Sequence, residues 1–401
     1  MHEKKIIVYL TEFKVRKYDI QRLDINEFES FLGYKTEVHE LIDYIHPGFS
    51  SMFTNQYQDI RIKSFSSLKD WKERMHVLEK NFGRNILIVN LIPLINFKCL
   101  MVNYFIKKNR FKTIVFRNIS IPIFNPIKDL KYLLRFLKKN FFSFKKLSNL
   151  IMKVGLNFIA KRIKLFPNYL IVFGEKDAKK MNEIKNTKII FGHSFDYNMH
   201  LKYKNIDYDK ENNYGLFLES AAPTHNLGDY YVENKDEFLG TREKWLNSVN
   251  NFLDIIEKEF NIRILIIPHP KIKHLKKFST LYNGREVIQD GLYLVSKKAK
   301  VIIARSSAGF SYAVINKIPA IFIHTNELMK NERIIKDQEY FASCMGTKPV
   351  NIDKNISKEN LEKFLSFDEK IYDNYLRNYL STRKDEKKNF EIIKECVSKQ
   401  I

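Results

Sequence analysis

The sequence predicts an α/β protein of two doubly wound, Rossmann-like domains, and three observations support this fold class. The chain of 401 residues is too long for a single hydrophobic core and long enough for two domains. Short apolar runs alternate with segments of helical periodicity along both halves. Hydrophobic residues make up 44% of the chain, and glycine and proline are scarce, which excludes a collagen-like or low-complexity protein.

The first domain is predicted to span residues 1–195. Ile6–Leu10 is predicted as its first strand, Ile20–Leu32 as a helix that Gly33 ends, and Thr36–Val38 as the next strand. Further short apolar runs predict strands at Ile86–Asn90, Thr113–Phe116 and Tyr169–Phe173. Continuous apolar runs of this kind are typical of a parallel sheet that is covered on both faces.

The second domain is predicted over residues 214–367, after an interdomain segment at 196–213. A helix is expected from Thr241 to Phe260, and residues 368–401 are expected to form a charged helix that packs back on the first domain. Further helices are predicted at Lys271–Leu281, Leu292–Ala299 and Gly309–Asn316. Strands are predicted between the helices at Gly215–Leu218, Ile262–Ile267, Glu286–Ile288, Val301–Ala304 and Pro319–Ile323.

The net charge of +23 comes mainly from lysine. Lysine, asparagine, isoleucine, phenylalanine and tyrosine share A/T-rich codons, so genome composition alone can supply much of this charge. No nucleic-acid module is visible, and we expect no nucleic-acid partner. Cys99, Cys344 and Cys396 are too widely separated for a disulfide framework, and the N-terminus predicts a buried strand rather than a signal peptide. These features predict a cytoplasmic protein.

Residues 128–166 depart from the strand–helix pattern, because aromatic and aliphatic residues there are interleaved with lysine and arginine. A basic amphipathic helix of this kind can lie on an anionic membrane surface. It can equally be an ordinary helix that covers the sheet and turns a lysine-rich face to solvent. The segment therefore leaves peripheral contact with the inner face of the plasma membrane open.

Polar residues follow the predicted strands of the second half, where ligands bind in open α/β sheets. Arg305, Ser306, Ser307 and Gly309 stand where a strand ends and a helix begins, a typical position for a phosphate. The alternative is simple helix capping by either serine. His269 follows the neighbouring strand and can hold the same phosphate or protonate a leaving group. His225 follows the first strand of this domain.

The runs Ile266–Pro270, Arg305–Gly309 and Ile318–Phe322 resemble the donor half of GT-B-fold glycosyltransferases. They are most similar to bacterial sialyl- and polysialyltransferases, which use CMP-activated sugars, and to glycerophosphotransferases that use CDP-glycerol. The resemblance covers about Tyr214–Ile323. It implies two domains that face across a cleft, and contacts of His269, Ser306 and Ser307 with the nucleotide phosphate.

The sequence departs from the CMP-sugar enzymes at one motif. Those enzymes carry an acidic-acidic-Gly triplet with the catalytic base upstream of the His-Pro pair, and this chain has none there. The similar triplet at Gln289–Gly291 lies downstream, so we expect Asp290 to end a strand beside the nucleotide rather than to act as the base.

The general base is therefore expected in the first domain. Glu12, at the end of the first strand, is the preferred candidate, and Asp19 is the second, although it is also an obvious helix N-cap. His46-Pro47 is interpreted as a chain break, and Asp207-Tyr208-Asp209 as a solvated turn rather than a metal motif. The further residues expected to face the acceptor in the cleft are Arg16, Arg117, Glu175, His193 and Asp196.

Together these observations predict a metal-independent, cofactor-free GT-B-type glycosyltransferase of bacterial capsule or lipopolysaccharide assembly. It would transfer a sugar from a nucleotide-activated donor, with a CMP-sugar favoured, to a glycan or lipid-linked acceptor. Three alternatives remain open: a transferase of glycerol phosphate or a pyruvyl group, a UDP-sugar epimerase, and a non-catalytic scaffold for glycan assembly.

Overall fold

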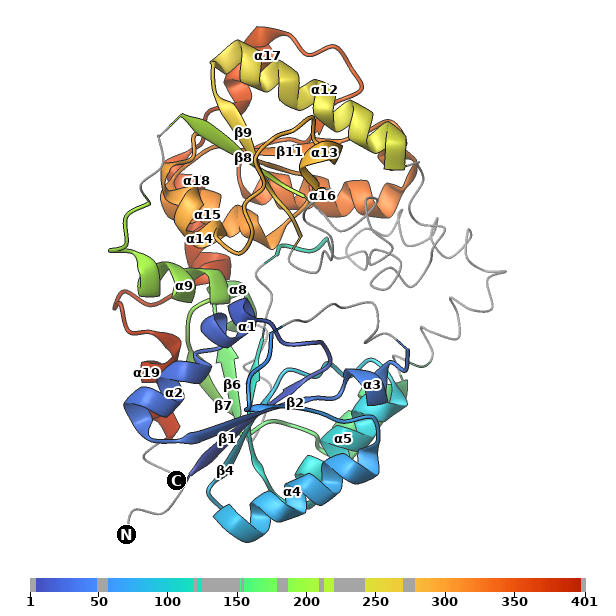
Figure 1. Cartoon of the computed structure of the whole chain (residues 1–401), viewed down its shortest axis with the longest axis vertical. Helices are drawn as coiled ribbons and strands as arrows, with labels where there is room; N and C mark the ends of the chain where they lie inside the picture. Colours follow the sequence, from blue (N-terminus) through green and yellow to red (C-terminus); the bar gives the residue numbers. More distant parts are fainter. Residues whose placement is uncertain are drawn as a thin grey trace.

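The computed structural model contains two α/β domains, each built on a parallel sheet (Figure 1). It describes residues 5–48, 57–117, 121–124, 152, 155–178, 187–208, 213–219, 242–269 and 278–397. Within these residues no helix is long and apolar enough to cross a membrane. His225, Thr241 and most of residues 128–154 lie outside the described residues.

The first sheet has the strand order β3-β2-β1-β4-β5-β6-β7, with every neighbouring pair parallel. The chain winds outward from β1 in both directions, first to β2 and β3 on one side and then to β4, β5, β6 and β7 on the other. This is the doubly wound pattern that the sequence predicts. Ile7 and Tyr9 of β1 pack into one hydrophobic cluster, while Val8 and Leu10 pack into the cluster on the opposite face. Its strands are β1 Ile6–Thr11, β2 Lys35–Glu40, β3 Ile62–Ser64, β4 Ile86–Asn90, β5 Lys112–Phe116, β6 Tyr169–Val172 and β7 Lys188–Phe191.

The helix predicted at Ile20–Leu32 is two helices, and this corrects the prediction. The chain breaks at Asp24, which has a left-handed backbone with φ of 58°. The buried Asp24 carboxylate accepts hydrogen bonds from the Asn198 side chain at 3.0 and 3.1 Å and from the Phe390 backbone at 3.1 Å. The helices between these strands are α1 Lys17–Arg22, α2 Ile25–Leu32, α3 Ile42–Ile45, α4 Leu68–Phe82, α5 Phe97–Lys108, α8 Glu175–Ala178 and α9 Phe195–Tyr203.

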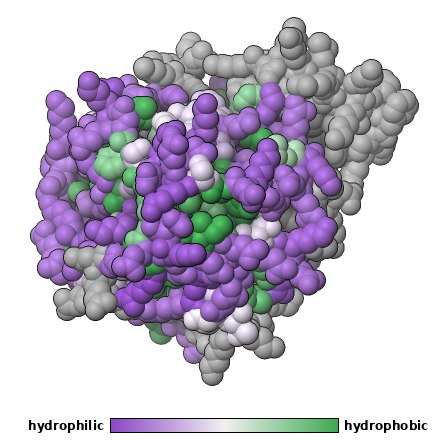
Figure 2. Space-filling view, turned by 90° about the horizontal axis from the view of Figure 1, so that it is seen from above, coloured by the Kyte–Doolittle hydropathy of each residue, from purple (hydrophilic) through white to green (hydrophobic). Residues whose placement is uncertain are grey.

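The second sheet has the order β12-β11-β10-β8-β9 and is also parallel. Its strands are β8 Tyr214–Leu218, β9 Arg263–Ile267, β10 Ile302–Ala304, β11 Ala320–His324 and β12 Val350–Asn351. The strand predicted at Glu286–Ile288 is wrong, because only Val287 forms a bridge, to Ile266. The helices are α12 Arg242–Phe260, α13 Phe278–Leu281, α14 Leu292–Val295, α15 Ser311–Asn316, α16 Glu332–Cys344, α17 Lys358–Phe364 and α18 Glu369–Tyr375, with short η helices at Ser296–Lys298, Ala308–Phe310 and Leu328–Lys330. Seen from the second domain's end, the surface is mainly hydrophilic, with a smaller hydrophobic area near the centre of the view (Figure 2).

Residues after 367 return to the first domain, as predicted, but they do not form the single helix predicted over 368–401, because the chain is not helical at 381–388. After α18 and the π-helical turn η8 (Leu376–Leu380), α19 (Asn389–Val397) lies beside α2 (Figure 1). Phe390, Ile392 and Ile393 of α19 belong to the hydrophobic core of the first domain. Two parallel-sheet domains with this returning helix agree with the GT-B-like fold class predicted from the sequence.

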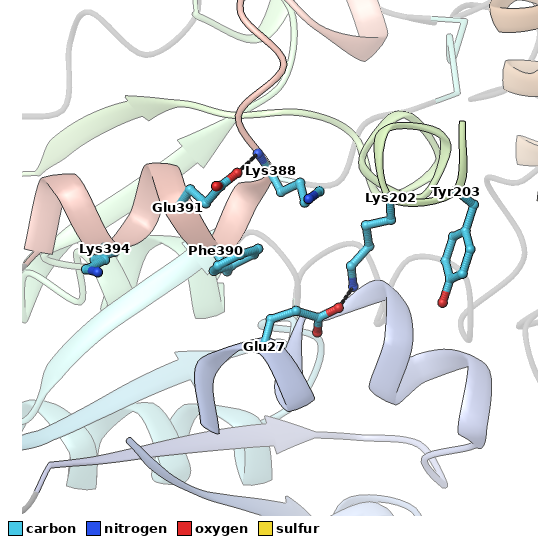
Figure 3. Close-up of a pocket in the computed structure, with 7 residues that line it drawn as sticks. All are labelled: Glu27, Lys202, Tyr203, Lys388, Phe390, Glu391 and Lys394. Carbon is cyan, nitrogen blue, oxygen red and sulfur yellow. Dashed lines mark hydrogen bonds and ion pairs between the residues drawn. The ribbon is translucent and has the colours of Figure 1, made fainter. Parts of the chain in front are cut away.

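A cavity of about 480 Å³ lies where α2, α9 and α19 meet (Figure 3). Lys202 of α9 points across it to Glu27 of α2 and also pairs with Asp24, with Nζ 2.7 Å from Asp24 Oδ1. Lys202 is almost completely buried, so these ion pairs neutralise a charge that burial would otherwise penalise. We therefore interpret this cluster as an anchor for the C-terminal helix.

Candidate functional site

Three polar residues lie together at the carboxyl edge of the second sheet. Glu219 follows β8, His269 follows β9, and Arg305 follows β10. Leu218, the last residue of β8, pairs with Ala304 of β10 and with Ile267 of β9, so the three strand ends are level. This is the edge of a parallel sheet at which ligands bind. His225, predicted at the same edge, lies outside the described residues.

Arg305 is the most informative residue of this edge. Its Nε atom is buried and has no hydrogen-bond partner among the described residues. Burial lowers the pKa of Arg305, and the neighbouring Glu219 carboxylate opposes that shift. The backbone is held by Gln338, whose Nε2 donates to the carbonyl oxygens of Arg305 at 2.5 Å and Ile323 at 2.8 Å. A guanidinium whose Nε is buried and has no acceptor among the described residues is well suited to an anion.

The residues after Arg305 have two different roles. Ser307 Oγ accepts a hydrogen bond from the Gly309 backbone at 3.1 Å and so caps the short helix η6, as the capping alternative predicts. Gly309 packs tightly: a Cβ there would lie 2.6 Å from Leu218 Cδ1 and 2.8 Å from Leu292 Cδ2. Gly309 therefore allows the helix start to approach β8 closely. Ser306, next to Arg305, is half-buried, and so is His269, which follows the end of β9. Contacts of these two residues with a phosphate stay predictions.

Asp19 lies in an ion-pair cluster, which gives it a different role from the predicted base and N-cap. Arg16 Nε is 2.8 Å from Asp19 Oδ2, and Arg22 Nε is 3.0 Å from Oδ1. Burial alone would raise the pKa of Asp19, but Arg22 and Arg16 hold it below its usual value. Arg16 occupies the N-cap position of α1, and Asp19 completes the capping box from the third helical position. A carboxylate bound on both oxygens by two arginines is poorly placed to accept a proton.

Arg16 also connects the two domains. Asp290 of the second domain, in a left-handed conformation with φ of 55°, is close enough to contribute to the raised pKa of Arg16. Burial raises the pKa of Asp290, and Arg16 opposes this shift. Asp290 was predicted to end a strand beside the nucleotide; it follows the single bridge at Val287 instead and lies near Arg16 at the domain junction.

Asp196, at the start of α9, lies at the same junction. Burial raises the pKa of Asp196 to about 6, while a hydrogen bond with Ser311 of α15 and the charge of Arg22 act in the opposite direction. Because α15 belongs to the second domain, this contact joins the domains. Its place between Arg22 and Ser311 agrees with the prediction that Asp196 lies where the two domains meet.

His193 and Glu175 contact the C-terminal part of the chain rather than an open cleft. His193 is fully buried; its Nδ1 accepts from Ser381 Oγ at 2.7 Å and its Nε2 donates to the Lys387 carbonyl at 2.9 Å. A carbonyl oxygen can only accept, so Nε2 carries the proton. Burial lowers the pKa of His193 to about 4, and the ring is neutral. Glu175 lies 3.6 Å from Arg377 of η8.

A second set of polar residues lies at the carboxyl edge of the first sheet. Glu12, just after β1, lies with Oε2 3.5 Å from Nε2 of His46, a residue that its sequence context predicts only as part of a chain break. Both side chains are about one-fifth exposed, so solvent or a ligand can reach them. No local pattern indicates this pair, because 34 residues separate its members. Arg117 is half-buried after β5, at the same edge of the sheet.

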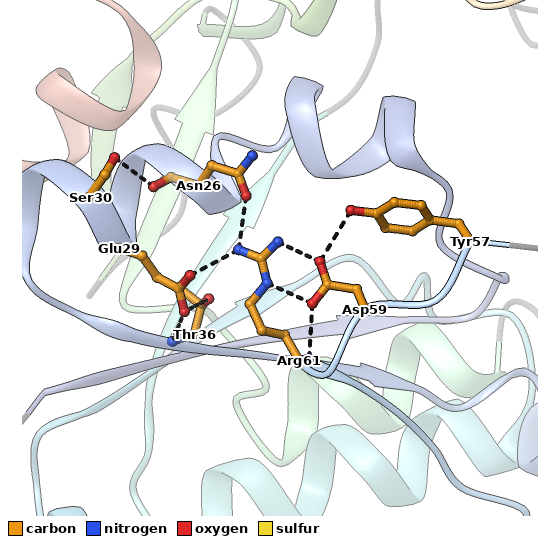
Figure 4. A network of polar contacts seen from close by, with 7 residues as sticks. All are labelled: Asn26, Glu29, Ser30, Thr36, Tyr57, Asp59 and Arg61. Atoms are coloured by element: carbon orange, nitrogen blue, oxygen red, sulfur yellow. Dashed lines mark hydrogen bonds and ion pairs between the residues drawn. The ribbon is translucent and has the colours of Figure 1, made fainter.

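A cavity of about 530 Å³ opens at this edge, beside β2 and β3. Lys14 Nζ lies in it, 2.9 Å from Glu40 Oε2 and 3.0 Å from Ser64 Oγ. Its outer wall is formed by Tyr57 and Asp59, which Arg61 holds in place by reaching from Asp59 to Glu29 and Asn26 of α2 (Figure 4). The cavity is therefore polar, preformed and close in the sheet to Glu12.

No group of three or more histidine, cysteine, aspartate or glutamate side chains in the described part of the chain could hold a metal ion. Asp207 of the predicted solvated turn is described and Asp209 is not. The chemistry available at the two sheet edges is thus a buried cation on the second domain, and a carboxylate–imidazole pair beside a polar cavity on the first.

Neither a protein-family model nor a curated protein sequence matches the chain. Solved structures match it over most of its length at low identity. MurG of Acinetobacter baumannii is 8% identical with a TM-score of 0.42, over 93% of this chain and 94% of that one. UDP-GlcNAc 2-epimerase of Methanocaldococcus jannaschii, in complex with UDP-GlcNAc and UDP, is 15% identical with a TM-score of 0.47, over 98% and 99%. Phytolacca americana UGT2, complexed with UDP-2-fluoro-glucose and pterostilbene, is 10% identical with a TM-score of 0.43, over 93% and 89%.

Proposed function

We propose that this protein is a glycosyltransferase that binds the phosphate of a nucleotide-activated sugar at the carboxyl edge of its second sheet. The observation that carries the proposal is the buried Nε of Arg305, just after β10, which has no hydrogen-bond partner in the part of the chain that the structure describes. Burying a guanidinium donor without an acceptor is costly, and a phosphate oxygen would supply that acceptor. Ser306 and His269 are the neighbouring groups proposed to contact the same phosphate.

The proposed reaction is displacement at the anomeric carbon by an acceptor hydroxyl. The hydroxyl oxygen forms the new bond to that carbon, and the bond from the carbon to the phosphate oxygen breaks. The bonding electrons leave with the nucleotide phosphate, whose negative charge Arg305 stabilises. The hydroxyl proton passes to the Glu12 carboxylate, and His46, 3.5 Å away, orients that carboxylate.

The proposed acceptor is a growing surface glycan or a lipid-linked sugar, held in the polar cavity lined by Lys14, Glu40 and Ser64. A lipid-linked acceptor would bring the protein to the cytoplasmic face of an anionic inner membrane. The proposed donor is a CMP-sugar, on the resemblance of the His269 and Arg305 runs to CMP-sugar enzymes. UDP-sugars are the main competitor, since the epimerase and UGT2 structures above hold UDP compounds.

The donor site is tested by thermal shift with CMP, CDP, UMP, UDP, GDP and phosphoenolpyruvate. A ligand at about 100 times its Kd stabilises the folded protein by about 2.7 kcal/mol. Losing a hydrogen bond to a charged group costs about 1.5–3 kcal/mol, so Arg305→Gln should weaken nucleotide binding by about tenfold to a hundredfold. Arg263→Gln is the matched control, because Arg263 is exposed at the amino end of β9. The strands that precede His269 and Arg305 are not neighbours as predicted, because β8 lies between β9 and β10.

A shift with a nucleotide that Arg305→Gln removes and Arg263→Gln retains would support the proposal and identify the base. A shift with phosphoenolpyruvate alone would replace it with pyruvyl transfer, and no shift at all would favour a non-catalytic scaffold. Incubation with a UDP-sugar in the absence of any acceptor distinguishes the epimerase alternative from a glycosyltransferase. Only an epimerase converts the sugar to its epimer under these conditions.

A further inference from the structure

The positive charge of the chain is concentrated in one stretch. Residues 91–174 contain seventeen lysines and arginines and a single acidic residue, Asp129. Most of the net charge of +23 therefore comes from this fifth of the sequence. Genome composition acts on the whole chain, so it does not account for the near absence of acidic residues here.

Exposed apolar side chains occur within the described part of this stretch. In the helical residues 155–162, Leu156 is buried, whereas Phe158 is 68% exposed and Ile159 is 41% exposed. Phe166, which follows this helix, is 43% exposed. Leaving large apolar side chains in water is unfavourable, and exposed groups of them mark binding surfaces.

Contacts with α5 join these residues to a second basic element. Lys107 Nζ donates to the carbonyl oxygens of Ile163 and, at 2.8 Å, of Lys164. Lys107, Lys164 and Phe166 also line one cavity of about 410 Å³. Tyr104, one turn before Lys107 on α5, is 45% exposed. The α5 terminus and residues 155–166 thus form one surface.

The cations of this surface are not neutralised. Six are exposed, and none of them forms an ion pair among the described residues: Lys107, Lys108, Arg110, Lys161, Arg162 and Lys164. By contrast, Lys14 and Arg61 of the first domain are paired with carboxylates. A surface of unpaired cations around exposed aromatic residues complements an anionic interface that has an apolar interior.

We infer that this surface, formed by these six cations with Tyr104, Phe158, Ile159 and Phe166, docks on an anionic phospholipid bilayer. The apolar side chains enter the boundary between headgroups and acyl chains, and the cations contact lipid phosphates. The inference builds on the membrane contact within the proposed function but not on the transfer reaction. RNA offers phosphates too, but Ile159 cannot stack on a base, whereas it is readily buried in a bilayer.

The test is co-sedimentation of the full chain with vesicles of phosphatidylglycerol and phosphatidylcholine, compared with vesicles of phosphatidylcholine alone. Each cation near an anionic surface contributes about 1 kcal/mol. The variant Lys161→Gln/Arg162→Gln/Lys164→Gln should therefore bind the anionic vesicles about a hundredfold more weakly. The control Lys258→Gln/Lys300→Gln/Lys370→Gln removes the same charge from exposed positions outside this surface and should bind as the wild type does.

A second variant separates lipid from other polyanions. Phe158→Ser/Phe166→Ser keeps every charge and should weaken vesicle binding about tenfold or more, with little effect on binding to RNA. Two results would overturn the inference. The first is that the triple glutamine variant or the double serine variant binds anionic vesicles as tightly as the wild type. The second is that RNA displaces the protein from vesicles while the double serine variant behaves as the wild type. The nucleotide shifts of Arg305 variants are measured without vesicles, so failure of the proposed reaction shows separately.

Discussion

The ion-pair cluster around Asp19 makes a quantitative prediction for Asp19→Asn. The Asp19 side chain is completely buried, while the side chains of Arg16 and Arg22 keep 21% and 25% of their surface exposed. Removing one member of a buried ion pair costs about 3–5 kcal/mol, because a charge is left uncompensated. Since both arginines retain contact with water, we expect the lower end, about 3 kcal/mol. For a domain of this size, that loss lowers the unfolding temperature by about 6–12 °C.

The assay is thermal unfolding by circular dichroism across a range of pH. The pKa of Asp19 is depressed in the folded protein, so its contribution is present above its unfolded pKa of about 3.9 and is lost as pH falls through the folded value. The wild type and Asp19→Asn should therefore differ at pH 7 and converge in acid. Asp385→Asn is the control: its carboxylate is 41% exposed, unlike that of Asp19, so breaking its pair with Arg383 should cost about 1 kcal/mol or less. An Asp19→Asn protein as stable as this control at pH 7 would refute the reasoning.

Three further changes give distinct outcomes. Glu12→Gln should lower kcat for sugar transfer, measured by steady-state kinetics, by at least about a hundredfold, and it should leave the nucleotide-induced thermal shift unchanged. Loss of both the activity and the thermal shift would contradict a role of Glu12 as the base. Burial raises the pKa of Asp196 to about 6 in the folded protein, so this carboxylate destabilises the fold increasingly as pH rises from its unfolded pKa of about 3.9 to about 6, and Asp196→Asn should raise the unfolding temperature at pH 8 but not at pH 3. Gly309→Ala places a Cβ 2.6 Å from Leu218 Cδ1 and should destabilise the second domain by about 1–3 kcal/mol, as denaturant unfolding would show.

The strands predicted correctly are those buried on both faces, because a continuous apolar run such as Ile86–Asn90 leaves few alternatives. The strands β3, β7 and β12 were missed, since they are only three, four and two residues long and include Lys63, Lys188 and Asn351. The break between α1 and α2 carries no glycine or proline signal. It depends on Asn198 and Phe390, which are distant in sequence, so local pattern cannot reveal it.

In the candidate site, too, features set by local sequence could be predicted, and features set by residues distant in sequence could not. Positions at strand ends, such as Arg305 and Glu12, follow from topology and were found from the sequence. The surroundings of His193 depend on Ser381 and Lys387, almost two hundred residues away, and were not predictable. The Asp19 cluster is different, because Arg16 and Arg22 lie three residues to either side on one helix face. That spacing was a readable signal of an ion pair.

The return of α19 to the first domain has a consequence for how the chain folds as it is synthesised. Phe390, Ile392 and Ile393 complete the core of the first domain, yet they are translated after the strands of the second sheet. The second sheet, by contrast, is complete at Asn351. The core of the first domain is therefore completed only after the second sheet has been translated, and that domain must persist with an open core while the second domain folds. Deletion of α19 would consequently damage the first domain rather than the second domain that precedes α19 in the sequence.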